Sequence, residues 1–403
     1  MKKLLSLLGI VLILSTLLIT FASCGVEYYV PADNVEEEQE DTTTKSFPKT
    51  EKEKRSIYDS AMSFLAANDW ISAYNYFLQI PDYEDVPEYL AGFSYQAQTL
   101  VIRDITEDLK GEGTQLYNIS TTISDYGYFH GETLTDYSVS GTITTKKTTV
   151  DQIKVPDPSD DTKKINEKHG RPEKVSYPEY TFFGQTIYGY TVNYVYANEN
   201  SSQVKTEKIY FSVYPQALEI HYTYNENKSI QKINITWPRD LIPYNYEFQY
   251  VYNNGKLTQI KFVDLSQGAD PTPVEYANYT YNAKGQLTSI TYPGGSVDPI
   301  ESLKTYTGNK NEWTAPVWDE ENAYTITYTY NAKGQRATEI LNYKNSDDKD
   351  QTTVYEKYNS NGILEQKTVT MKVKVTVDEV EELQLKTYRY NYTQIKLCYD
   401  PLS

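Results

Sequence analysis

The fold is decided by a fourteen-residue stretch of the C-terminal half, Tyr279–Tyr292, which reads YTYNAKGQLTSITY. Close relatives of this stretch recur at Tyr222–Lys228, Tyr250–Leu257 and Tyr328–Gln335. In each copy tyrosines two positions apart lead into asparagine. A glycine usually follows, because a short hairpin loop requires positive φ. In the copy without glycine, Asn227 is the residue expected to take that conformation. Each copy therefore predicts a strand, a tight turn and a second strand.

The first strand of each copy alternates between two kinds of side chain. One set of alternate positions is aromatic or aliphatic, as at Tyr246, Phe248, Tyr250 and Tyr252; Leu218, Ile220, Tyr222 and Tyr224; and Tyr324, Ile326, Tyr328 and Tyr330. The intervening positions are mostly Thr, Glu, Gln and His. Such alternation is typical of an antiparallel sheet with one buried face. The 41 tyrosines against 11 phenylalanines favour the same class, since tyrosine suits half-buried strands.

The copies follow a nearly constant period. Their second tyrosines lie at positions 196, 224, 252, 281, 330 and 358, which gives intervals of 28, 28, 29, 49 and 28 residues. A fixed period of this size indicates a repeat architecture, here with two strands in each unit. One insertion of about 20 residues interrupts it, and the outer copies are degenerate, as expected of caps. Residues 369–390 read as a longer closing hairpin. A meander of about a dozen strands is expected to curl or to close into a barrel.

The motif YxYNxxGxLTxI in these copies resembles the YD repeat of RHS proteins and of related tyrosine-rich lipoproteins of gut bacteria. The resemblance covers about Tyr188–Ile395. This chain has asparagine where the family usually has aspartate, at positions 225, 253, 282, 331 and 359, and its period exceeds the roughly 20 residues usual in RHS shells. The resemblance implies hairpin geometry and a loose association with cell-surface contact and carbohydrate binding. It implies no catalytic residue.

The N-terminus predicts export and lipid anchoring. A charged start, Met1–Lys3, precedes an apolar run, Leu4–Thr20, as in a signal peptide. The run ends at Phe21-Ala22-Ser23-Cys24, which resembles a bacterial lipobox with Phe21 in place of the usual leucine. We expect residues 1–23 to be a lipoprotein signal peptide and Cys24 to be acylated, so that the protein is extracytoplasmic and anchored to the bacterial cell membrane. The alternative is an uncleaved N-terminal helix.

Charge and cysteine content narrow the function classes. Loss of Lys2 and Lys3 with the signal peptide changes the formal charge from −17 to −19. So acidic a chain argues against nucleic acid as a partner. Cys398 is the only cysteine besides Cys24, so no intramolecular disulfide is expected once Cys24 is acylated.

The expected domains give an α+β protein, with a small helical module before a large antiparallel β meander. Residues 24–51 are acidic and polar, which predicts a disordered tether. Residues 52–111 have helical periodicity and resemble a tetratricopeptide-like hairpin, with a third helix from Pro87 to about Lys110. Such a module is either a spacer or a peptide-binding element. Residues 112–175 read as irregular β structure, and residues 176–403 as the YD-repeat-like domain.

Candidate chemistry is sparse. The three histidines are far apart, and the chain has no metal-binding, phosphate-binding or nucleophile motif, so we expect no enzyme activity, no metal and no cofactor. The insertion at 293–323 holds Trp313 and Trp318 near Asn311 and Asp319. Aromatic faces beside amides and carboxylates hold sugars, although the tryptophans would equally pin the loop to the sheet.

The sequence therefore predicts a non-enzymatic surface lipoprotein that acts as a binding or structural scaffold. The alternative is a carbohydrate-binding component that uses the insertion. An enzyme acting on surface glycans would need carboxylates that converge on the sheet. The expected partners are the membrane, through the N-terminal lipid, and a glycan or a surface protein.

Overall fold

The computed structural model describes residues 49–399 with gaps at 125–128, 140, 151–152, 158–159, 168–170, 184, 199–200, 202, 212–215, 238–243, 268–270, 295–319, 346–348 and 378–379. The expected signal peptide, Cys24 and nearly all of the tether lie outside the described residues.

Three helices begin the described chain: α2 (Glu51–Ala66), α3 (Trp70–Phe77) and α4 (Val86–Ala91). The α2 helix starts with a capping box, in which the Thr50 hydroxyl accepts from the backbone N–H of Glu53 and the Glu53 carboxylate accepts from that of Thr50. Ala61 of α2 and Ala73 and Phe77 of α3 are fully buried where the two helices pack. Within the described residues, no helix has the length and apolar character needed to cross a membrane.

The predicted third helix is wrong in its length. The α4 helix begins beside Pro87 as expected but ends at Ala91, and the chain continues as strand β1 (Phe93–Asp104). β1 forms backbone ladders on both sides, with β2 and with β22. Two ladders outweigh the helical periodicity of this segment, because helix propensity is a weak prior that tertiary contacts override. The helical module therefore ends near Gly92 rather than at residue 111.

Eighteen strands form one antiparallel sheet in which each strand pairs with the next along the chain. They are β1, β2 (Thr114–Ile123), β3 (Phe129–Asp136), β4 (Thr142–Val150), β7 (Pro172–Tyr177), β10 (Tyr190–Tyr196), β11 (Val204–Phe211), β12 (Leu218–Tyr224), β13 (Ile230–Trp237), β14 (Tyr244–Asn253), β15 (Lys256–Asp264), β16 (Val274–Tyr281), β17 (Leu287–Tyr292), β18 (Tyr324–Tyr330), β19 (Arg336–Tyr343), β20 (Gln351–Tyr358), β21 (Leu364–Val377) and β22 (Val380–Tyr399). Two small hairpins, β5 (Ile153–Asp157) with β6 (Asp160–Glu167) and β8 (Tyr180–Phe182) with β9 (Gln185–Ile187), stand apart from it, as do the 3₁₀ turns Leu265–Gln267 and Glu320–Asn322.

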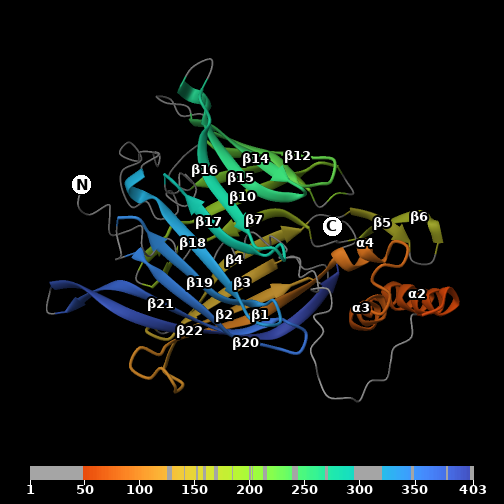
Figure 1. The fold of residues 1–403 in the computed structure, drawn as a ribbon, viewed down its shortest axis with the longest axis horizontal. Helices are drawn as coiled ribbons and strands as arrows, with labels where there is room; N and C mark the ends of the chain where they lie inside the picture. The colour runs from red at the N-terminus through yellow and green to blue at the C-terminus, as the bar shows by residue number, and fades with distance from the viewer. Residues whose placement is uncertain are drawn as a thin grey trace.

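The sheet closes into a barrel, which is one of the two forms expected for the meander. The last strand, β22, pairs with the first, β1, from Phe93 opposite Tyr399 to Asp104 opposite Tyr388. Closure removes both sheet edges, which would otherwise be open to pairing with other chains. Figure 1 shows the front wall formed by β16–β20 and the long β21–β22 hairpin, with the three helices grouped beside the barrel. The segments 112–175 and 176–403 contribute neighbouring strands to one sheet, so they are not separate units.

The apolar face of the sheet lines the inside of the barrel. A buried cluster runs across β7 and β10–β18 and includes Leu218, Phe248 and Phe262. The helices pack on the opposite face, against Phe93 and Tyr399. No helix among the described residues covers the buried cluster, so its burial must come from the facing wall of the barrel. The outer face carries the polar half of the alternation, as at Glu247 and Gln249 or Thr327 and Thr329.

A second buried cluster lines the inner face of β1, β2, β3, β21 and β22. The β8–β9 hairpin packs into it through Phe182 and Ile187, and the backbone N–H of Phe183 donates to the Tyr117 hydroxyl at 2.9 Å. This hairpin lies between β7 and β10 in the chain and contacts β2 and β22, which are three and five strands away from β7 around the ring. It therefore fills part of the interior that repeat side chains alone do not fill.

The predicted turn chemistry is confirmed with one correction. Asn254, Gly255, Gly285, Gly334 and Gly362 all have positive φ, as short hairpin loops require. In the copy without glycine, however, the residue with positive φ is Lys228, at 64°, rather than Asn227. The Asn227 side chain instead accepts hydrogen bonds from the backbone and hydroxyl of Ser229. An Asx turn of this kind holds Asn227 in place and moves the left-handed position one residue on.

Candidate functional site

The second tyrosine of every copy performs one structural task. Its hydroxyl donates to a backbone carbonyl at the start of the return strand of the preceding hairpin. The six bonds join Tyr196 to Pro172 (2.7 Å), Tyr224 to Val204 (2.7 Å), Tyr252 to Ile230 (2.9 Å), Tyr281 to Leu257 (2.8 Å), Tyr330 to Leu287 (2.6 Å) and Tyr358 to Arg336 (2.7 Å). We call these six bonds the tyrosine staples. Each one ties a repeat to its predecessor, so the repeat period is a structural requirement.

The staples lie where each hairpin ladder is irregular. The register shifts between the residue before the second tyrosine and that tyrosine in all six hairpins, for example between Thr280 and Tyr281. A bulge disrupts the regular exchange of backbone hydrogen bonds. The tyrosine hydroxyl of the next repeat donates to the carbonyl beside the bulge. This bond avoids the free-energy cost of a buried carbonyl without a hydrogen-bond partner.

Removal of one staple is expected to have a measurable but modest effect. Tyr281→Phe deletes the hydroxyl that donates to Leu257, and we expect a loss of about 1 kcal/mol in the free energy of unfolding. Tyr343→Phe is the matched control, because the Tyr343 hydroxyl is buried and has no hydrogen-bond partner among the described residues. It should be neutral or slightly stabilising. Urea unfolding followed by circular dichroism measures both; equal losses would contradict the role of the staples.

Asparagine after the second tyrosine also has a structural role. In Asn282 the side-chain oxygen accepts from the backbone N–H of Gln286 at 3.0 Å, and the amide nitrogen donates to the Gln286 side-chain oxygen at 2.9 Å. Asn331 and Gln335 repeat both contacts. Aspartate would keep the first contact but cannot donate the second. This contact favours asparagine over aspartate at positions 282 and 331.

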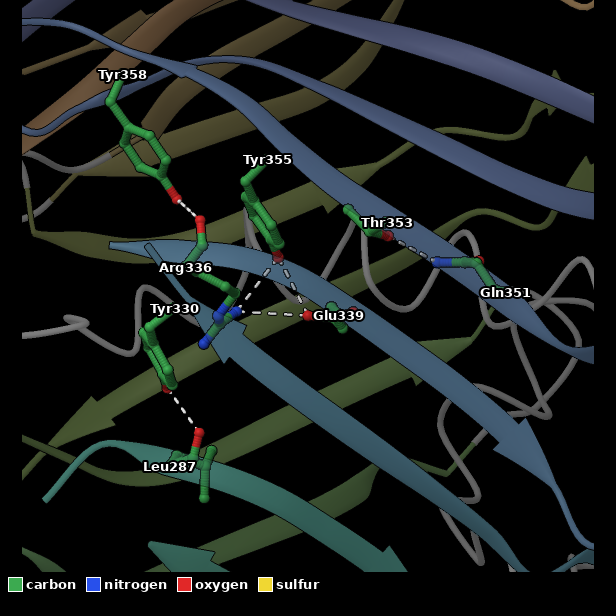
Figure 2. Close-up of polar contacts among 8 residues, drawn as sticks. All are labelled: Leu287, Tyr330, Arg336, Glu339, Gln351, Thr353, Tyr355 and Tyr358. Carbon is green, nitrogen blue, oxygen red and sulfur yellow. Dashed lines mark hydrogen bonds and ion pairs between the residues drawn. The ribbon is translucent and has the colours of Figure 1, made fainter. Parts of the chain in front are cut away.

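The inner face also carries an ionic cluster that the alternation does not predict (Figure 2). Arg336, at the start of β19, contacts the Glu339 carboxylate at 3.4 Å and the Tyr355 hydroxyl at 3.3 Å. The Tyr355 hydroxyl in turn lies 3.1 Å from the same carboxylate oxygen. The Arg336 guanidinium also lies 4.4 Å from the centre of the Tyr328 ring. Strand register places these side chains on the inner face. Glu339 lies directly opposite Tyr328 on one side and Thr353 on the other, so all three share that face. Tyr355 shares it too, because it is two residues beyond Thr353 on the same strand.

The electrostatics of this cluster suit groups that hold one another in place, rather than an acid or base that transfers a proton. Burial, followed by the charge of Glu339, raises the pKa of Tyr355 to about 12, although Lys367 and Arg336 oppose the shift. The hydroxyl therefore stays protonated near neutral pH and acts as a donor. Glu339 is held by Arg336 and Tyr355, which leaves it poorly placed for acid–base work. Beside it, the Gln351 amide donates to the Thr353 hydroxyl at 3.4 Å, and both side chains are buried (Figure 2).

The residues proposed from the sequence for ligand binding, Trp313, Trp318, Asn311 and Asp319, lie outside the described residues, as does the proposed lipidation site, Cys24. The base of their insertion is described. It joins the adjacent strands β17 and β18, where Tyr292 opposes Tyr324 and the two rings stack with centres 4.6 Å apart. The insertion therefore leaves and rejoins the barrel at one aromatic pair.

Other candidate groups have ordinary surroundings. His221 lies on the outer face of β12, with Nε2 3.3 Å from Glu219 and Nδ1 3.2 Å from the Thr206 hydroxyl. The Cys398 thiol is fully buried and lies 3.6 Å from the carbonyl oxygen of Ser124. Within the described part of the chain, no three His, Cys, Asp or Glu side chains are placed to hold a metal ion.

Neither a protein-family model nor a curated protein matches this chain. It is similar to a porin-like protein from Bacteroides uniformis, with 11% identity and a TM-score of 0.32 over 74% of this chain and 98% of that chain. It is also similar to the TcdB2-TccC3 complex (14% identity, TM-score 0.25) over 68% of this chain and 16% of that chain. A Tc holotoxin pore of Photorhabdus luminescens has 15% identity and a TM-score of 0.24 over 68% of this chain and 15% of that chain. At such low scores these similarities carry no argument about function.

Proposed function

We propose that this protein is a non-enzymatic, extracytoplasmic scaffold, a YD-repeat-like barrel that a lipid on Cys24 tethers to the bacterial membrane. The observation that supports the proposal best is the set of tyrosine staples. The most distinctive groups of the repeat, the second tyrosine and the asparagine after it, make their hydrogen bonds within the fold. A repeat whose polar groups are occupied in this way provides a rigid body. Its partner is a glycan or another surface protein.

The polarity of the barrel supports a position in water. The outward side chains of β12, β14 and β18 are mainly Thr, Glu, Gln and His, and the aromatic side chains face inward. Only the N-terminal lipid would then contact the bilayer, through the acidic tether. The helical module does not act as a free spacer in this arrangement, because α3 packs against the barrel: the Trp70 and Tyr399 rings lie 5.5 Å apart, and the Tyr74 and Phe93 rings 5.2 Å apart.

Cys24→Ser tests the tethering directly. The wild-type chain, expressed in a bacterium that processes lipoproteins, should sediment with membranes and partition into detergent. The serine variant should appear in the soluble fraction, because serine at this position cannot form the thioether to the lipid. Cys398→Ser is the matched control: the Cys398 thiol is buried in the barrel, so its replacement should leave fractionation unchanged.

The folded state of both variants is checked by β-type circular dichroism. If Cys24→Ser, with residues 1–23 removed, still partitions with membranes as the wild type does, the proposed lipid tether is wrong. If the serine variant is released but its isolated barrel turns over a surface glycan, the non-enzymatic part of the proposal is wrong.

A further inference from the structure

Lys367 extends the ionic cluster of the inner face to the neighbouring strand. It lies on β21 directly opposite Tyr355 of β20 on one side and Tyr390 of β22 on the other. Directly opposite residues of an antiparallel pair share one face, so all three side chains belong to the inner face. The ammonium nitrogen is 5.9 Å from the centre of the Tyr355 ring and 5.4 Å from that of Tyr390. Arg336, Tyr355, Lys367 and Tyr390 thus form an alternating series of cations and aromatic rings.

This series carries an excess of positive charge. Two cations, Arg336 and Lys367, face one carboxylate, Glu339, which is already bound by Arg336 and Tyr355. Within the described part of the chain, Lys367 forms no ion pair within 4.0 Å, and the Tyr392 side chain lies among its electrostatic neighbours. Since an ammonium group has three donors, its hydrogen-bonding capacity is not used up. Burial acts to lower the pKa of Lys367, but Tyr392, Tyr355 and Glu339 raise it above its ordinary value, so the side chain remains charged.

A second group near Lys367, the Tyr390 hydroxyl, lacks a hydrogen-bond acceptor among the described residues. The Tyr390 hydroxyl is buried, with the residue 1% exposed, and it has no hydrogen-bond partner among the described residues. A buried donor of this kind ordinarily bonds to a protein group, a water or a bound ion. The ring of the same residue, Tyr390, lies beside the Lys367 ammonium group. An acceptor that binds there would therefore supply both a counter-charge and a hydrogen bond.

Water reaches this part of the barrel. The Arg336 side chain is 21% exposed and Glu339 15% exposed, and Lys367 is likewise partly exposed although it faces inward. Lys367 lies only four residues beyond Ile363, at the end of the tight turn that joins β20 to β21. The cluster is thus near the end of the barrel that carries the Asn turns.

We infer that Lys367, with Arg336, Tyr355 and Tyr390 around it, is an oxyanion-binding site on the inner face of the barrel. The ligand group is a carboxylate, sulfate or phosphate, whose negative oxygens complement an ammonium group beside hydroxyl donors. The site provides the scaffold with selectivity for an acidic group even though the whole chain carries a formal charge of −17. The inference is independent of the lipid tether.

Calorimetric titration of the purified full chain tests the site. Sodium sulfate, inorganic phosphate and sodium acetate are added separately at constant ionic strength, with chloride as the balancing anion. We expect at least one of them to bind with a Kd of about 1 mM or tighter, and Lys367→Gln to weaken that binding at least tenfold. Lys367→Arg keeps the charge and should stay within a few-fold of wild type. Lys256→Gln, which removes an exposed lysine over the Tyr281 ring, should bind as wild type does.

The three anions distinguish the sources of the oxyanion. Binding of acetate alone assigns the site to carboxylates, and binding of sulfate or phosphate alone assigns it to tetrahedral anions. Circular dichroism confirms that each variant is folded. If the glutamine variant is not folded, Tyr390→Phe decides the test, because it removes only the buried hydroxyl assigned to the ligand and should weaken the binding severalfold. The inference is overturned if wild type binds none of the anions, or if folded Lys367→Gln binds them as tightly as wild type.

Discussion

Phe248→Ala is expected to lower the free energy of unfolding by about 3–5 kcal/mol, because it removes a large aromatic side chain from the inner core. Phe248 is 7% exposed, and its ring lies 5.4 Å from Phe262 and 4.9 Å from Tyr276, measured between ring centres. These three rings come from β14, β15 and β16, so the substitution leaves a cavity shared by three strands. Equilibrium unfolding in urea, followed by far-ultraviolet circular dichroism, measures the loss.

Val251→Ala on the same strand provides the control. Val251 lies three residues away on the opposite face and is 38% exposed. Truncation at an exposed position leaves no cavity, so we expect a change within about 0.5 kcal/mol. A loss at Val251 as large as that at Phe248 would mean that the face assigned to water is the buried one.

The repeat region could be predicted from the sequence because its signals are local. Alternation through Tyr246–Tyr252 fixes which side chains share a face, and Asn and Gly fix the turn, within fewer than fifteen residues. The long hairpin of β21 and β22 is equally local, since its two strands adjoin in the chain. Each of these elements therefore appears in the structure at nearly the expected residues.

Closure of the barrel depends on the most distant pair in the chain. β1 pairs with β22 across almost 300 residues, as between Thr99 and Thr393. Periodicity within Phe93–Asp104 is compatible with a helix or with a strand, and only the presence of both partner strands decides between them. The sequence was therefore compatible with a closed barrel. It did not show, however, that residues 93–104, which were expected to be helical, form the strand that closes the ring.

The ionic cluster was not predicted for a related reason. Glu339 and Lys367 occupy inner positions of their strands, but a charged residue in an alternating segment reads as an outward position when the register is unknown. Only the pairing of Tyr355 with Lys367, and of Lys367 with Tyr390, places these charges inside. The signal that could have been used is the break in apolar alternation, at Glu339 before Leu341 and at Lys367 before Val369. The tyrosine staples could not be predicted either, because each one joins two hairpins and the sequence alone does not show which hairpins are neighbours.

Ile102→Lys and Val101→Lys form the sharpest test of closure, because the two residues are adjacent and the barrel places them on opposite faces. Ile102 is fully buried against Tyr390 and Tyr117, its directly opposite partners on β22 and β2. A lysine there would bury an unpaired charge in the closing strand, and we expect a loss of more than about 4 kcal/mol or no folded protein at all.

Val101 faces outward, beside Asn391 of β22 and Asn118 of β2, and borders a shallow polar hollow of about 220 Å³ that Arg103 and Arg389 also line. Lysine at this position reaches water along its own stem, so we expect a loss of no more than about 1 kcal/mol. Urea midpoints and the fraction of soluble protein separate the two cases. If the two lysines cost the same, β1 has no buried face, and the ring of eighteen strands is not closed by β1 and β22. If Val101→Lys is the damaging one, the inner and outer faces of the barrel are reversed, and the aromatic residues of the repeats would form an outer surface.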